Sequence, residues 1–80
     1  MSPARKEPDT NRYAGRFAVR LRTLREKAGL TPEEVGEKLG VSFVTIYHWE
    51  QGKHFPKPDQ LPQLAEIVGL KTVGGLFPPK

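Results

Sequence analysis

Residues 32–51, closed by Gly52, constrain the fold of this chain more than any other part of its sequence. Apolar residues recur there at helical spacing in two short runs, and Gly40 lies between the runs. A second glycine, Gly36, lies where two crossing helices would need a close backbone approach. The apolar positions are Val35, Leu39, Val41, Ile46 and Trp49. The segment therefore predicts two short helices joined by a tight turn, without a pattern typical of a catalytic site.

Start and end signals give both helices defined limits. The first helix is expected to begin after Thr31, which can cap it, and Glu34 completes a capping box three residues later. This helix is expected to end at Gly40, and the second helix to extend from a Ser42 cap to Gly52. Two helices joined in this way form a helix-turn-helix motif, whose second helix can lie in the major groove of DNA.

Helical patterns also occur on both sides of this motif. Residues 14–28 include apolar residues at helical spacing, and Gly29 is expected to end this helix in the left-handed conformation. After the motif, Asp59 is expected to cap a helix that ends at Val68, which places Pro62 in the first turn, where a missing N–H costs little. The sequence thus predicts an all-α fold, a compact bundle of four to five helices.

The two ends of the chain differ from this bundle. Residues 1–13 are polar and charged and contain prolines, so they are expected to form a flexible basic N-terminal arm. Residues 14–77 form the predicted helix-turn-helix domain, in which residues 72–77 add at most a final turn, and residues 78–80 form a tail. Four apolar residues near this end are the visible candidates for a dimer seam: Val73, Leu76, Phe77 and Pro78.

Length and composition restrict the class of protein further. Eighty residues suffice for one small domain, which buries only about 60% of its unfolded surface. The chain has no cysteine, which excludes a disulfide framework and a CxxC metal site and favours a reducing compartment. Because it has neither an apolar signal-peptide region nor a long apolar run, we expect no membrane span and a cytoplasmic protein, nucleoid-associated when bound to DNA.

The net charge of +4 is concentrated in the N-terminal part of the chain. Residues 1–30 hold eight Lys/Arg against three carboxylates, a net +5, whereas residues 31–80 hold five against six, a net −1. This asymmetry favours a polyanionic partner approached by the N-terminal part. A solvated basic helix would give the same charges, so the charge alone leaves both interpretations open.

Helical geometry predicts which face of the helix after Ser42 is exposed. At about 100° per residue, Ile46 and Trp49 define the buried direction. The opposite face holds Val44, Tyr47, His48 and Gln51, with Phe43 at its edge and Thr45 and Glu50 on the flanks. This face has no formal charge when its histidine is neutral, whereas an ordinary solvated face would be charged.

Three interpretations of this uncharged face remain open. In the first, its apolar side chains contact thymine methyl groups, His48 and Gln51 hydrogen-bond base edges and Tyr47 binds a phosphate. In the second, the face binds a protein partner, since aromatic residues are favoured at interfaces. In the third, Phe43 and Tyr47 extend the core against the loop that contains Phe55.

Several short stretches of the sequence are each weak signals alone, but their order and spacing along the chain are together specific for one family. The pattern L-R-x-x-R-E-x-x-G-L-T spans residues 21–31, G-V-S-x-x-T-I-x-x-W-E-x-G spans residues 40–52, and Pro56 follows four residues later. Leu64-Ala65 and Leu76-Phe77 also fit. Over about residues 17–77 the chain thereby resembles the lambda-repressor/Cro-like (XRE-type) helix-turn-helix proteins.

This resemblance implies a five-helix DNA-binding domain that acts as a transcriptional regulator, often as a dimer on a pseudo-palindromic site. It also implies a structural ion pair between Arg25 and Glu50, so neither residue is expected to contact DNA. In the family a glutamine usually follows the threonine that begins this helix, and it helps to bind the DNA backbone. Here Pro32 takes its place, so Thr31 and the backbone amide of Glu33 are left to make the expected phosphate contact.

Other positions also depart from the pattern of the family. Phe43 and Val44 replace the usual polar or basic residues, so methyl contacts are favoured there over hydrogen-bonded base readout. Gly36 replaces the usual alanine and keeps the close approach of the two helices. Lys53 and His54 match the loop that contacts phosphates in the family, and the basic character of that loop is kept.

The sequence shows no pattern typical of an enzyme or of a cofactor site. His48 and His54 are its two histidines, and a pair of histidines without cysteine is insufficient for a usual zinc site. The glycines form no phosphate-binding motif, and a capping role fully explains Ser42. We therefore predict that the chain is not an enzyme and that it needs no cofactor or metal.

Taken together, these features predict sequence-specific binding of double-stranded DNA by a transcriptional regulator of the repressor type. The principal base readers are expected to be Val44, Tyr47 and His48, and the secondary ones Phe43 and Gln51. The expected phosphate contacts are Thr31, Thr45, Lys53 and His54, with Arg5, Lys6 and Arg12 of the arm. A homodimer on DNA would supply usable affinity. The alternative is a helix-turn-helix module that binds protein, antitoxin-like or coactivator-like, whose binding would depend weakly on salt.

Overall fold

The computed structural model describes residues 13–77 of the chain. It contains four α-helices, which are α1 (Tyr13–Lys27), α2 (Pro32–Leu39), α3 (Phe43–Glu50) and α4 (Leu61–Ile67). Two short 3-10 helices, η1 (Pro58–Gln60) and η2 (Val73–Leu76), precede and follow α4. Since no strand occurs within these described residues, the predicted all-α bundle is confirmed.

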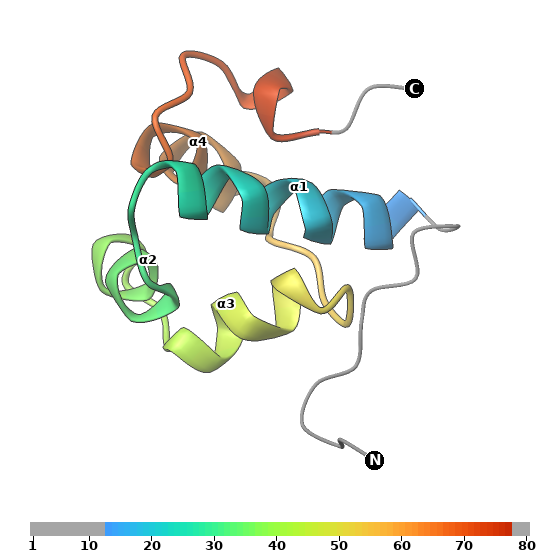
Figure 1. Ribbon diagram of the computed structural model, residues 1–80, viewed down its shortest axis with the longest axis horizontal. Helices are drawn as coiled ribbons and strands as arrows, with labels where there is room; N and C mark the ends of the chain where they lie inside the picture. Colours follow the sequence, from blue (N-terminus) through green and yellow to red (C-terminus); the bar gives the residue numbers. More distant parts are fainter. Residues whose placement is uncertain (1–12, 78–80) are drawn as a thin grey trace.

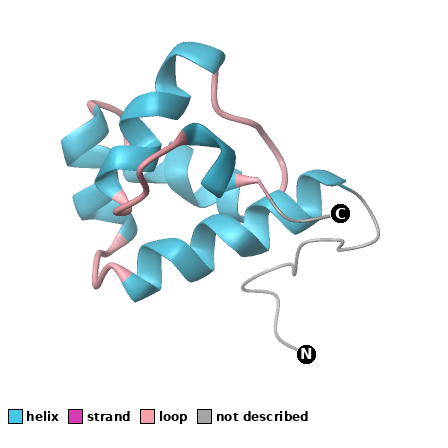
Figure 2. Ribbon diagram, turned by 90° about the horizontal axis from the view of Figure 1, so that it is seen from above, coloured by secondary structure: helices cyan, strands magenta, loops and turns pink. Residues whose placement is uncertain are grey.

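In Figure 1 the long helix α1 crosses the middle of the molecule, with α2 and α3 on one side and η2 on the other. α3 packs against both α2 and α1, while α4 packs against α2 and η2. The loop after α3 returns to the N-terminal part of α1, where the ring centroids of Phe55 and Phe17 are 4.5 Å apart. Figure 2 shows the same helices from above, joined by short loops.

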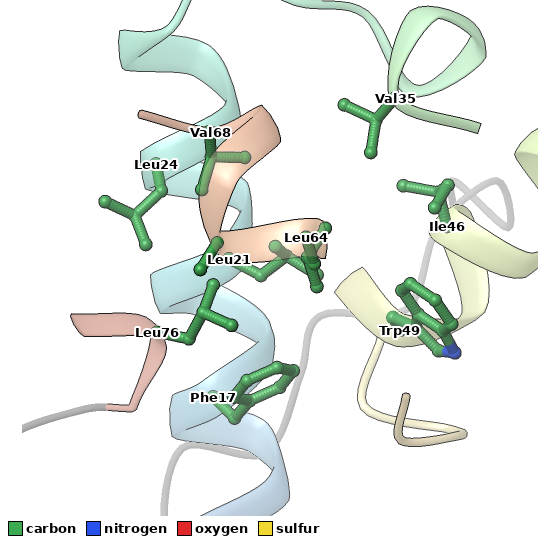
Figure 3. Close-up of a cluster of buried hydrophobic side chains, with 10 residues drawn as sticks. Phe17, Leu21, Leu24, Val35, Ile46, Trp49, Leu64, Val68 and Leu76 are labelled. Atoms are coloured by element: carbon green, nitrogen blue, oxygen red, sulfur yellow. The ribbon is translucent and has the colours of Figure 1, made fainter. Parts of the chain in front are cut away.

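A single apolar core joins these helices. The buried side chains of α1 are Phe17, Leu21 and Leu24. They meet Leu64 of α4 and Val68, the residue that follows this helix, at the centre, as Figure 3 shows. On the α2–α3 side the core is completed by Val35, Ile46 and Trp49. Burial of this apolar area is what stabilises a domain of this size, because few other interactions are available to it.

The helix limits agree with the sequence signals for the first three helices. α1 lies within one residue of the predicted range, and the capping box at the start of α2 is present: Thr31 Oγ1 accepts from the N–H of Glu34, whose carboxylate accepts from the N–H of Thr31. α2 ends at Gly40 in the left-handed conformation. At the start of α3, Ser42 Oγ accepts from the N–H of Val44. These caps satisfy N–H groups that have no partner inside their helices.

The predicted start of the fourth helix was wrong. Asp59 does not cap it; the chain turns earlier, into η1, where the N–H of Lys57 donates to Gln60 Oε1 at 2.9 Å. Pro62 lies in the first turn of α4, as predicted, but it has no N–H to donate to the carbonyl of Pro58. The N–H of Leu61 donates to that carbonyl instead, which produces the tighter 3-10 geometry before the helix proper.

The C-terminal turn also differs from expectation. η2 follows α4 as a defined turn, and its Leu76 is fully buried in the core. The guanidinium of Arg20 donates to the carbonyl of Gly75 through Nε at 3.2 Å and through Nη2 at 3.1 Å. Leu76 therefore belongs to the core and not to the predicted dimer seam, whose Val73 and Phe77 are half-buried and whose Pro78 lies outside the described residues.

Candidate nucleic-acid interface

The core anchors α3 through one face of the helix. Ile46 and Trp49 are buried and point toward α1 and α4 in Figure 3, as predicted. At the other side α2 crosses the start of α3 so closely that a Cβ at Gly36 would lie 2.7 Å from the carbonyl oxygen of Val41 and 3.3 Å from the N of Phe43. Glycine is thus required at this crossing, and α3 is held against the body of the molecule along its length.

The opposite face of α3 is open at its front. Phe43 is 49% exposed and Val44 is 43% exposed. An ordinary solvated face of a helix would carry charged side chains at such positions. Further along the face Tyr47, His48 and Gln51 are half-buried. The third interpretation fails for Phe43, because Phe55 packs its ring on Phe17 of α1 and Phe43 keeps half of its surface exposed.

The end of α3 brings together basic residues that the family resemblance had assigned to phosphates. Gly52 takes a φ of 77°, and the N–H of Lys53 donates back to the carbonyl of His48 at 3.0 Å. This left-handed turn reverses the chain, so the rings of His48 and His54 lie 5.2 Å apart. Lys53 and His54 are exposed there. Sequence periodicity gave no sign of the histidine contact, because the loop after Gly52 has no repeating geometry.

The predicted phosphate contacts on α2 and within α3 lie in a less favourable setting. Thr31 is exposed at the start of α2, but its hydroxyl oxygen and its N–H both take part in the capping box. Glu33 and Glu34 lie in the same first turn, and carboxylates at that point repel a phosphate that the helix dipole would otherwise attract. Thr45 is half-buried on the flank of α3.

The implied pair between Arg25 and Glu50 is present. Arg25 Nε lies 2.6 Å from Glu50 Oε2 and Nη2 lies 3.0 Å from Oε1, while Nη1 donates to the carbonyl of Leu30 at 2.8 Å. The side chains are 11% and 6% exposed, and hydrogen bonding to Glu50 raises the pKa of Arg25 above its ordinary value. Glu50 is thereby turned into the body of the molecule, which removes the carboxylate from the exposed face of α3.

The remaining predicted contacts, Arg5, Lys6 and Arg12, lie outside the described residues, as does most of the predicted arm. Within residues 13–77 no three side chains of the metal-binding types gather. No helix in this described part is long and apolar enough to cross a membrane.

The geometry of α2 and α3 agrees with the comparison of the sequence with protein families. The profile of the helix-turn-helix domain family matches residues 16–73, which is most of the chain. The chain belongs to the helix-turn-helix domain family. This confirms the resemblance that the spacing of residues 21–31 and 40–52 predicted, and the matched range includes both α2 and α3.

Solved structures similar to this helix-turn-helix domain include regulators. The restriction-modification controller protein C.AhdI from Aeromonas hydrophila matches with a TM-score of 0.74 and 25% identity, over 80% of this chain and 96% of that chain. A hypothetical transcription factor from Neisseria, NHTF, matches with a TM-score of 0.76 and 20% identity, over 99% of this chain and 88% of that chain, which shows the fold alone.

An enzyme is also among the similar structures. The hydroxypropylphosphonic acid epoxidase from S. wedmorenis matches with a TM-score of 0.71 and 30% identity over 79% of this chain. The matched part spans only 33% of the epoxidase chain, so the likeness concerns one helical portion of that enzyme. No curated protein sequence matches the chain.

Proposed function

We propose that this protein is a regulator that binds double-stranded DNA sequence-specifically, with α3 in the major groove. The observation that carries the proposal is the position of α3. Its inner face is fixed by the buried Ile46 and Trp49, the carboxylate of its Glu50 is paired with Arg25, and its outer face carries no carboxylate. A helix of this kind fits a groove without repulsion from phosphates. The similarity to a restriction-modification controller supports the same function.

We propose distinct roles for the residues along the outer face of α3. Val44, Tyr47 and His48 are the proposed principal base readers, and Phe43 and Gln51 are secondary ones. Lys53 and His54, exposed where the chain leaves α3, bind phosphates beside the groove. Thr31 and Thr45 remain candidate phosphate contacts of lower weight, because the former is engaged in a capping box beside two carboxylates and the latter is half-buried.

The attachment of the arm supports a contribution of Arg5, Lys6 and Arg12. The first turns of α1 lie beside the loop after α3, since Phe17 contacts Phe55. The first described residue, Tyr13, thus begins α1 on the side of the molecule that holds this loop, and Arg5, Lys6 and Arg12 precede it in the sequence. A domain of this size binds weakly alone, so two copies on half-sites about one helical turn apart are proposed to supply the affinity.

Selection of random duplex DNA by the purified protein at moderate salt tests this function. Enrichment of a motif, especially of two inverted half-sites about one turn apart, is the expected result. Binding should also weaken steeply as salt increases, because Lys/Arg–phosphate contacts release counterions.

A flat selection, with binding lost at moderate salt, would contradict sequence-specific DNA binding. It would favour the second candidate, a module that binds protein through Phe43 and Val44, since these two side chains form an exposed apolar surface. Binding to such a partner should change little with salt.

A further inference from the structure

The outer face of α3 is chemically divided along its length. Its first turn presents Phe43 and Val44, the two large apolar side chains of this helix that are exposed. Its last turn presents the half-buried His48 and Gln51, next to the exposed Lys53 and His54. The front of the helix therefore offers apolar surface to a partner, and the rear offers hydrogen-bonding and basic groups.

The polar side chains near the first turn, Ser42 and Thr45, lie beside the two apolar ones and not among them. Ser42 Oγ accepts from the N–H of Val44 at 3.1 Å, so the hydroxyl oxygen is used for capping. Thr45 is half-buried on the flank. What projects from the front of α3 toward a partner is therefore hydrocarbon, which cannot distinguish base pairs by hydrogen bonds.

The edges of base pairs in the major groove have one apolar feature, the methyl group at C5 of thymine. A 5-methylcytosine presents a methyl group at the same position of its ring. A side chain that lacks donors and acceptors can discriminate in this groove by contact with such a methyl group, while it leaves the polar base edges that it covers without partners.

The front of α3 is also held in place, as specific contact requires. Gly36 allows α2 to approach the backbone of residues 41–43 within contact distance, and the Ser42 cap fixes the first turn. Phe43 and Val44 are thus presented from a rigid backbone, which lowers the entropic cost of placing them against a base edge.

We propose that the first turn of α3 reads C5-methyl groups of pyrimidines in the major groove, with Val44 and Phe43 as the reading side chains. This inference rests on the proposed DNA-binding function and specifies the chemistry that it recognises. The half-site is accordingly expected to contain thymines under the front of α3, and bases read by hydrogen bonds under His48 and Gln51.

Replacement of single thymines by uracil in the highest-affinity selected duplex tests the inference, because uracil lacks only the methyl group. Each contacted thymine should raise Kd about fourfold when it is replaced, the ratio expected for burial of one methyl-sized group. A contacted T·A pair exchanged for C·G should lose affinity, and methylation of that cytosine at C5 should recover about fourfold. The uracil and 5-methylcytosine duplexes separate the two sources of the methyl group.

Matched protein variants assign the effect to α3. Val44→Thr keeps the branched shape but replaces one of the two γ-methyl groups with a hydroxyl, and it should reduce the difference between thymine and uracil at the base that Val44 contacts. Val19→Thr makes the same exchange on α1 at a valine of similar exposure, 40%, and should leave the ratio unchanged.

The outcomes separate the inference from the function on which it rests. Specific binding with equal Kd for the thymine and uracil duplexes at every position overturns methyl readout and leaves the DNA-binding function intact. A thymine preference that is undiminished in both Val44→Thr and Phe43→Ala, in variants that retain specific binding, also overturns the assignment. Absence of specific binding to any duplex overturns the proposed function and the inference together.

Discussion

Glu50 lies in the helix that is proposed to contact DNA, yet its carboxylate faces α1. Both carboxylate oxygens accept from Arg25, and the pair is almost completely buried. Because hydrogen bonding to Glu50 raises the pKa of Arg25, the stability that this arginine contributes is fully present below its unfolded pKa. This stability is lost only when the pH rises through the still higher pKa of Arg25 in the folded state. Arg25 therefore makes the free energy of unfolding no more dependent on pH across the neutral range.

Removal of one partner of this pair should be costly. In Glu50→Gln the guanidinium of Arg25 stays buried without its counter-charge, and we expect the free energy of unfolding to fall by about 3–5 kcal/mol. Chemical denaturation measures this loss. The double variant Arg25→Met/Glu50→Leu is the control, because it removes both charges and should be more stable than either single variant. A single variant as stable as the parent protein would show that the pair contributes little.

Gly36 gives a second prediction at the scale of one residue. Gly36→Ala improves the helix propensity of α2 by about 1 kcal/mol, but its Cβ would lie 2.7 Å from the carbonyl oxygen of Val41. The separation of α2 and α3 must then increase, so we expect a net loss of about 1–3 kcal/mol in thermal or chemical unfolding.

Gly74→Ala is the matched control for this substitution. A Cβ at Gly74 would meet only Thr72 Oγ1 at 3.8 Å, so stability should be unchanged or slightly higher. Equal effects of the two substitutions would contradict a specific close approach at Gly36.

At the scale of elements, η2 depends on contacts that are distant in sequence. Arg20 of α1 donates two hydrogen bonds to the carbonyl of Gly75, and Leu76 inserts into the core beside them. The glycines of this segment lower its intrinsic helix propensity. η2 is therefore held by α1 and the core rather than by its own sequence.

Arg20→Met should loosen η2 while α2 and α3 stay folded. Loss of a charged hydrogen-bonding group at a backbone carbonyl typically costs about 1.5–3 kcal/mol. We expect amide hydrogen exchange over residues 73–77 to be faster in the variant than in the parent protein. Exchange over α3, measured on the same sample, should increase less. Arg20→Lys keeps the charge but has no fork to donate two bonds, and should give an intermediate result. Unchanged exchange in η2 would assign its stability to Leu76 alone.

At the scale of the whole molecule, the described basic residues of the proposed interface, Lys53 and His54, follow α3, which lies on one side of α1 in Figure 1. Lys53 is exposed just after α3, whereas Lys71 is exposed between α4 and η2. Figure 1 shows η2 on the side of α1 away from α3. The two lysines have the same charge, so they separate a phosphate contact from a general effect of net charge.

Lys53→Ala should weaken DNA binding for all sequences, and the slope of log Kd against log salt should decrease by about 1. Lys71→Ala should leave that slope unchanged. Binding titrations of a selected duplex and of an unrelated duplex at several salt concentrations measure both slopes. Equal slopes for the two variants would remove Lys53 from the set of phosphate contacts.

Deletion of residues 1–12 tests the arm in the same way. The deletion removes Arg5, Lys6 and Arg12, so we expect lower affinity for every duplex and a decrease of the slope by up to about 3, with the selected motif unchanged. Unaltered affinity at low salt would exclude the arm from the mechanism.

The sequence by itself determined the elements that depend on local signals. Thr31, Ser42 and Gly40 fix the limits of α2 and α3 because caps and left-handed glycines act on their immediate neighbours. The outward direction of Phe43 and Val44 likewise followed from helical periodicity, which needs only the spacing of Ile46 and Trp49.

Only the tertiary structure decided the features that join distant parts of the chain. Leu76 belongs to the core because it joins a cluster with buried residues of α1, which lie far from it in the sequence. The contact of His48 with His54 depends on a loop without periodicity. Such features depend on packing in three dimensions, and a one-dimensional pattern records only the direction in which each side chain leaves its own helix.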